Sequence, residues 1–269
     1  MRSASGLKLV ILAAAFLGPT ACGPTRSDSG RDATRTPAAS VEGRPNPSTE
    51  RPAGCSGLAS AEELGRLLRA VPDLGDAGGL AGGRFEWAAI VDRQGEMCAV
   101  AVSTSDASGP WPGSQAIAKA KAFTANAFST DTVPLSTARL YTLTQPGHSL
   151  WGGGAINAFN PQCLSTPQDY TRPGPRLCGG TVAFGGGVPL YRGSTRVGGL
   201  GASGDTACAD HEIAKRIRDK MGLNPPGGPL ADDITYSKED GASVYTHPLC
   251  INTWRNGKKV GEEAAAVGY

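Results

Sequence analysis

The N-terminal segment restricts which part of this chain can fold. Arg2 and Lys8 precede an apolar run at residues 9–17, which small residues and a proline then end. A run of this length behind a basic start is typical of an export signal, and it is too short to cross a bilayer as a stable helix. We therefore expect residues 1–21 to be a signal peptide and the rest of the chain to fold outside the cytoplasm.

The segment Pro-Thr-Ala-Cys that ends at Cys22 resembles a bacterial lipobox. In such a motif the cysteine is acylated and becomes the mature N-terminus. The proline three places before Cys22 departs from the usual aliphatic residue. We expect a membrane-anchored lipoprotein, periplasmic or at the cell surface, with ordinary secretion as the alternative.

Composition separates a tether from a folded domain. Residues 23–54 are mostly Pro, Ser, Thr, Arg and Gly, and such a stretch buries too little apolar surface to offset the entropy of ordering it. Residues 55–269 remain for a single domain. The full chain has 39% hydrophobic residues, 38 Gly and 20 Pro, too apolar for a disordered protein and too turn-rich for a helical bundle. A net charge of +2 gives no strong attraction to nucleic acid.

Export determines how the cysteines are interpreted. Apart from Cys22 the chain has six, an even number suited to as many as three disulfides in an oxidising compartment. The sequence alone does not fix their pairing, but Cys163 with Cys178 would close the most proline-rich loop. The disulfide candidates are Cys55, Cys98, Cys163, Cys178, Cys208 and Cys250.

Hydrophobic periodicity predicts an antiparallel sheet of hairpins packed against helices, an α/β (α+β) fold. Ser60 and Glu63 form a capping box for a first helix, and Ser114 is expected to cap a second. A long loop insertion is expected at about residues 129–178. The predicted strand pairs are 84–91 with 96–103 and 181–191 with 196–202, and the last helix is expected at about 208–221.

Gly199, Gly201 and Gly204 spell G-x-G-x-x-G between a strand and a helix. This is the local pattern of dinucleotide binding, but the fingerprint also requires a βαβ unit with an acidic residue at the tip of a parallel strand. Here the preceding strand belongs to a predicted hairpin. We therefore interpret the glycines as permitting a tight turn from strand to helix.

Three segments carry a family resemblance: S-Q-A-I-A-K-A-K-A-F-T-A at 114–125, F-G-G-G-V-P-L at 184–190 and V-G-G-L-G-A-S-G-D at 197–205. They resemble the GlcG/HbpS family of haem-binding proteins, which includes the C-terminal domain of PduO. The resemblance implies a profilin-like α/β fold, self-association into a homo-oligomer and, in some members, binding or slow degradation of haem. This chain departs from short members by its leader, tether, insertion and C-terminal extension.

The histidines suggest where a haem would bind. Cys208-Ala-Asp-His211 and His247-Pro-Leu-Cys250 mirror each other, so a disulfide between Cys208 and Cys250 would bring His211 and His247 together. The pair would make a bis-imidazole site for haem iron or, with free thiols, a four-ligand zinc site. The alternative is a structural disulfide with bystander histidines.

Three further residues are candidates for contact with the cofactor. His148 lies beside Leu150 and Trp151 in the long loop, where it would cap a pocket or stay exposed to solvent. Lys121 and Thr124 lie in the matching helix segment and are candidates to face a ligand. The alternative for Lys121 is a charge that faces solvent or another subunit.

The sequence favours a haem or related tetrapyrrole ligand over catalysis. It has no G-x-S-x-G elbow, no S-x-x-K at a helix start and no H-E-x-x-H. The hypothesis is an exported haem-binding protein that stores, senses or slowly degrades haem. The alternatives are a cofactor-free accessory protein that forms oligomers and an enzyme of small-molecule, glycolate-type metabolism.

Overall fold

A four-stranded antiparallel sheet with strand order β2-β1-β4-β3 organises the fold. The computed structural model describes residues 51–170 and 175–266. Both predicted hairpins are present, and β1 pairs with β4 to join them. The strands are β1 (Trp87–Asp92), β2 (Met97–Val102), β3 (Gly187–Arg192) and β4 (Thr195–Ser203). This confirms the expected class of hairpins packed against helices.

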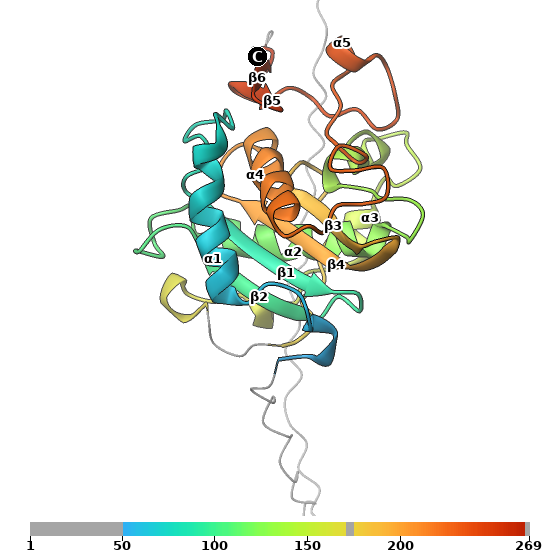
Figure 1. Ribbon diagram of the computed structural model, residues 1–269. Helices are drawn as coiled ribbons and strands as arrows, with labels where there is room; N and C mark the ends of the chain where they lie inside the picture. The colour runs from blue at the N-terminus through green and yellow to red at the C-terminus, as the bar shows by residue number, and fades with distance from the viewer. Residues whose placement is uncertain (1–50, 171–174, 267–269) are drawn as a thin grey trace, which may run out of the picture. The chain divides into compact units, whose positions relative to one another are not determined.

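Helices cover both faces of the sheet (Figure 1). Alternate residues of β1 point to opposite faces, as the pleat requires. Ala88 and Ile90 belong to the cluster that includes α1 (Ala61–Ala70) and α4 (Ala207–Lys220). Trp87, Ala89 and Val91 belong to the cluster with α2 (Ser114–Phe128). The sheet is therefore buried on both sides.

The glycine motif serves packing. A Cβ atom at Gly199 would collide with the carbonyl oxygen of Ala122, and one at Gly201 with that of Ala118. The backbone of α2 therefore lies directly on β4, which explains both the glycines and the alanines of the helix. Gly204 lies equally close to the Phe85 carbonyl.

Two of the three long helices begin with a side-chain cap. Ser60 accepts a hydrogen bond from the Glu63 amide at 3.1 Å, as the capping box predicts. Thr206 accepts one from the Ala209 amide at 3.3 Å at the start of α4. The expectation for α2 is wrong: Gly113 is the N-cap, while Ser114 is the first helical residue and its buried hydroxyl has no partner among the described residues.

The insertion after α2 contains only short elements, held to the domain by backbone and side-chain hydrogen bonds. Ser136 donates to the Asp232 carbonyl at 2.6 Å, and Thr137 donates to the Phe184 carbonyl at 2.6 Å. The short elements of the insertion are η3 (Thr137–Leu140), η4 (Thr142–Thr144), α3 (Gly153–Ile156), η5 (Pro161–Cys163) and η6 (Pro167–Asp169). Two others, η1 (Ala53–Cys55) and η2 (Val71–Leu74), lie before and after α1.

The C-terminal extension holds a second sheet that the sequence analysis missed. It follows α5 (Ser237–Asp240) and pairs β5 (Thr253–Arg255) with β6 (Lys258–Gly261). Asn256 and Gly257 both take positive φ, 53° and 77°, which is the backbone that a two-residue hairpin turn requires.

All six cysteines of the described chain are paired. The disulfides join Cys55 to Cys98, Cys163 to Cys178 and Cys208 to Cys250. The signal peptide at 1–21, Cys22 and most of the tether at 23–54 lie outside the described residues. Within the described ranges, no helix has the length and apolar character to cross a membrane.

Candidate functional site

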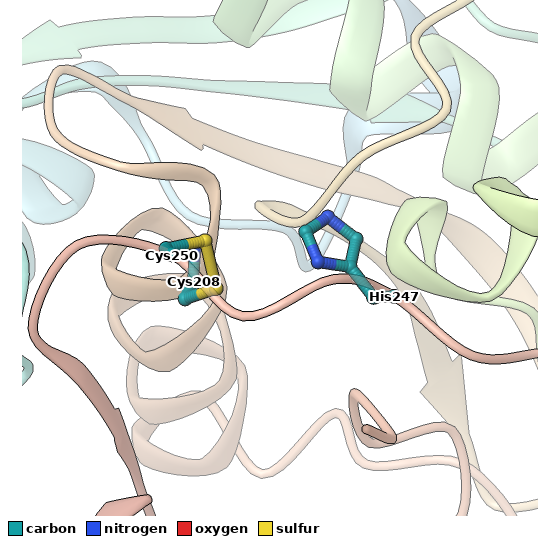
Figure 2. A group of neighbouring side chains, drawn as sticks. All are labelled: Cys208, His247 and Cys250. Carbon is teal, nitrogen blue, oxygen red and sulfur yellow. A yellow bond between two sulfur atoms is a disulfide. The ribbon is translucent and has the colours of Figure 1, made fainter. Parts of the chain in front are cut away.

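The disulfide between Cys208 and Cys250 joins the start of α4 to the C-terminal extension. Figure 2 shows His247 beside this bond, on the loop segment that leads to Cys250. The Cys208 amide donates a hydrogen bond to Cys250 Sγ at 3.2 Å. Ligand atoms of Cys208, His247 and Cys250 all lie within 4.8 Å of one another. The expected proximity of the two cysteines and His247 is therefore present.

His247 is enclosed by backbone groups. Nδ1 lies 2.7 Å from the Pro248 carbonyl, and Nε2 accepts a hydrogen bond from the Gly185 amide at 3.3 Å. The ring also packs against Tyr141, with 5.0 Å between ring centroids. Burial lowers the pKa of His247 to about 4, so the imidazole is neutral at pH 7.

His211 is fully buried and also lies near Gly185. A Cβ atom at Gly185 would lie 3.2 Å from the Cβ of His211, and the Gly185 amide donates to His247, so this glycine is close to both histidines. Nε2 of His211 lies 3.2 Å from the Ile234 amide nitrogen and 3.3 Å from Asp233 Oδ1. Burial opposes ionisation of Asp233, yet its contacts with His211 and Lys215 hold the pKa of that carboxyl below its usual range. His211 thus belongs to a buried polar network.

These surroundings do not fit a haem between His211 and His247. An axial ligand must present a free ring nitrogen to a cavity wide enough for the macrocycle. Both Nε2 atoms face backbone amides, and Nδ1 of His247 faces the Pro248 carbonyl. Nδ1 of His211 has no partner among the described residues but is buried, and the exposed fractions of His211 and His247 are 0% and 5%. Neither histidine lines either of two surface pockets, one beside Pro72 and Arg84 and the other beside Leu230 and Asn256. The expected bis-imidazole site is therefore not formed.

Thr124 and Lys121 are also enclosed, contrary to the expectation that they face a ligand. The Thr124 hydroxyl donates to the Ala120 carbonyl at 2.8 Å and accepts from the Val182 amide at 3.0 Å, which fixes the segment before β3 to α2. Lys121 Nζ forms an ion pair with Asp210 at 2.5 Å and donates to the Ala202 carbonyl at 3.0 Å. Both side chains of α2 are therefore buried in the protein interior.

A buried acidic pair next to Lys121 was not anticipated. Glu86 is fully buried, and neither of its carboxyl oxygens has a hydrogen-bond donor among the described residues. Burial, and then the charge of Asp210, raise the pKa of Glu86 well above its usual value. Burial likewise raises the pKa of Asp210, against the opposing effect of Lys121. We infer that Glu86 carries a proton shared with Asp210, while Lys121 balances one negative charge.

His148 is the one histidine of the chain that reaches solvent. It lies in a series of turns in which the His148 amide donates to the Gln145 carbonyl and the Trp151 amide donates to the His148 carbonyl, each at 3.1 Å. Its imidazole has no hydrogen-bond partner among the residues described. The exposed fraction of Trp151 is 65% and that of Ile156 is 90%. An accessible imidazole within eight residues of exposed apolar side chains is a combination that suits an iron porphyrin.

Residues 86–218 match a family model described as HbpS-like, a haem degrading protein family. Among solved structures, the Klebsiella pneumoniae protein ORFY is 19% identical, with 61% of this chain and 88% of that chain covered and a TM-score of 0.42. A PduOC:heme complex is 24% identical, with 60% and 91% covered and a TM-score of 0.43. HbpS of Streptomyces reticuli, as a double mutant, is 21% identical, with 70% and 99% covered and a TM-score of 0.38. No curated protein matches the chain.

The segments at 114–125, 184–190 and 197–205 all lie inside the matched region, so the resemblance drawn from the sequence is confirmed. Through residues 86–218, this chain is similar to the HbpS-like family.

Proposed function

We propose that this chain is an exported haem-binding protein, held to a membrane by a lipid on Cys22. The observation that supports binding is the match of residues 86–218 to a family of haem degrading proteins. Export and anchoring rest on the basic and apolar leader and on the lipobox-like residues before Cys22. Bacterial cells that express the chain can be labelled with a radioactive fatty acid to test the anchor. The wild-type chain should carry the label, and a Cys22→Ser chain should not.

We place the haem at the turns around His148. Among the three histidines only this one offers an imidazole without first opening the core. Trp151 and Ile156 supply exposed apolar surface within eight residues of it. Burial of such surface against a porphyrin contributes about 25 cal/mol per Å². His148 would hold the iron, and haem bound there would supply a redox-active iron centre.

Self-association is part of the proposal. The insertion carries exposed apolar side chains, such as Trp151, Ile156 and Leu164. Their burial against a second copy or a ligand would lower the free energy of the protein. Light scattering with and without hemin measures whether the mass of the particle is a multiple of the chain mass of 27.5 kDa.

Titration of the full chain with hemin, followed by the Soret band, tests the binding site. We expect a saturable shift with wild-type protein, with His211→Ala and with His247→Ala, and at least roughly tenfold weaker binding with His148→Ala. No saturable shift with any chain would contradict haem binding and favour the cofactor-free accessory protein. Loss of binding in His247→Ala alone would place the iron in the core instead.

Storage and degradation differ in what happens after binding. Haem that is stored keeps its Soret band when the complex is incubated with ascorbate in air, whereas degradation bleaches the band and releases iron. We propose slow degradation, by analogy with the description of the family. A stable Soret band over hours would refute this part of the proposal.

A further inference from the structure

The group of Cys208, Cys250 and His247 has the composition of a metal site that its disulfide keeps closed. Two sulfur atoms and one imidazole nitrogen lie within 4.8 Å of one another. In a tetrahedral zinc site with Zn–S bonds of about 2.3 Å, neighbouring ligand atoms are on the order of 3.7 Å apart. The His247 nitrogen therefore needs to move by only about 1 Å, and the sulfur atoms need to separate by less than about 2 Å once their bond is cleaved.

We propose that reduction of the Cys208–Cys250 disulfide creates a Zn²⁺ site with Cys208, Cys250 and His247 as its protein ligands. A dithiol reductant supplies two electrons and two protons, the S–S bond breaks, and the reductant becomes a disulfide. Zn²⁺ then displaces the two thiol protons and bonds to both sulfur atoms and to Nε2 of His247, which must first give up the hydrogen bond that it accepts from the Gly185 amide. Water occupies the fourth position.

Charge balance favours zinc in these surroundings. The disulfide packs against an apolar cluster that includes Ala138, Ile234 and Leu249. Two thiolates alone would bring two negative charges into this cluster, at a high cost in desolvation. With Zn²⁺ the group is neutral, because the two negative charges equal the charge of the ion and His247 adds none.

The backbone around the group already makes the contacts that metal ligands need. The Cys208 amide donates to Cys250 Sγ at 3.2 Å, and it would continue to donate to a metal-bound thiolate. The Pro248 carbonyl lies 2.7 Å from Nδ1 of His247 and 3.9 Å from Cys208 Sγ. Partners of this kind orient ligands and raise metal affinity.

The other disulfides lack this combination. Among the described residues, no third ligand group lies near Cys163 and Cys178. Cys55 and Cys98 have only the Asp92 carboxylate nearby, and its Oδ1 already accepts hydrogen bonds from the Gln94 and Glu96 amides at 2.9 Å each. The imidazole therefore distinguishes the Cys208–Cys250 pair. His211, part of the zinc site considered from the sequence, is not a member of the group.

The test uses Co²⁺ as a spectroscopic substitute for Zn²⁺ with the full chain. The protein is reduced with a phosphine, which becomes a phosphine oxide by taking an oxygen atom from water. The phosphine binds metals weakly, and it is removed before the Co²⁺ titration. We expect one Co²⁺ per reduced chain, with a thiolate-to-cobalt band in the near ultraviolet that Zn²⁺ abolishes, and no such band with the oxidised chain. Circular dichroism of the same sample reports whether the reduced domain remains folded.

Two variants assign the band. His247→Ala should weaken Co²⁺ binding at least roughly tenfold, whereas His211→Ala, a matched buried histidine outside the group, should leave the band in place. Cys208→Ser/Cys250→Ser, reduced in the same way, should show no band although the four other cysteines of the folded domain remain as thiols. The proposal is overturned if the reduced wild-type chain, folded or unfolded, binds no Co²⁺ in the stated ratio, if His247→Ala binds as tightly as wild type, or if the double variant keeps the band.

Discussion

Replacement of Glu86 by Gln tests the shared proton of the buried acidic pair. Burial and the charge of Asp210 raise the pKa of Glu86 well above 4.5, so the native state keeps a proton that the unfolded chain releases above that pH. A raised native pKa contributes stability below the unfolded value, and that contribution is lost as the pH rises toward the native value. In Glu86→Gln the side chain is neutral at every pH, and its amide donates to Asp210 without a titrating proton.

The magnitude follows from linkage. When only the native state holds one proton, the free energy of unfolding falls by about 1.4 kcal/mol for each unit by which the pH rises. At each pH between the unfolded and the native pKa of Glu86, the wild-type chain should therefore lose stability relative to Glu86→Gln with this slope. Titrating groups that do not contact the pair act equally in both chains and cancel from the difference, whereas Asp210 is coupled to Glu86 and its titration is part of the measured difference.

Urea unfolding at pH 5, 6 and 7 measures this difference. Trp87 is fully buried, so its fluorescence reports exposure of the core at the sheet. Glu239→Gln, at an exposed position, is the control and should follow the wild-type pH dependence. Equal slopes for wild type and Glu86→Gln would refute the shared proton, because Glu86 would then have the same charge in both states.

Three further perturbations have definite expected outcomes. Lys121→Met leaves the Asp210 carboxylate buried without its cation and should lower the free energy of unfolding by about 3–5 kcal/mol, measured in urea at pH 7. Gly201→Ala forces a Cβ atom against the backbone of α2 and should cost about 3 kcal/mol, a fall in Tm of roughly 6–12 °C by calorimetry; an unchanged Tm would mean that helix and strand separate freely. Cys163→Ser/Cys178→Ser opens a loop with a sequence separation of 15 and should cost about 3 kcal/mol in urea, whereas a loss below about 1 kcal/mol would show that the loop is held by other contacts.

Local patterns in the sequence predicted most of the sheet and its helices. Alternation and turn residues located both hairpins, and the capping box at Ser60 located the start of α1. The strand that carries Gly199 and Gly201 lies in a hairpin, as the sequence predicted. The β5–β6 hairpin was missed although Asn256-Gly257 is a strong turn signal, since both strands are too short to show alternation.

The candidate site depended on long-range geometry that periodicity does not carry. Mirror-image Cys and His spacing correctly brought Cys208, Cys250 and His247 together. It gave no information on the Gly185 and Ile234 amides, which occupy the Nε2 sides of the two buried imidazoles. Glu86 shows why a buried acid is hard to find from sequence, because it precedes a strand of ordinary composition. Only the pairing of β1 with β4 and the packing of α4 place it beside Asp210.

Iron anomalous scattering from crystals of the hemin-loaded chain tests the central claim most directly. The account predicts one strong peak per chain, within bonding distance of a ring nitrogen of His148 and beside Trp151, with His211 and His247 still packed about Gly185. A peak in the core between His211 and His247, or no ordered iron in crystals grown with saturating hemin, would contradict it.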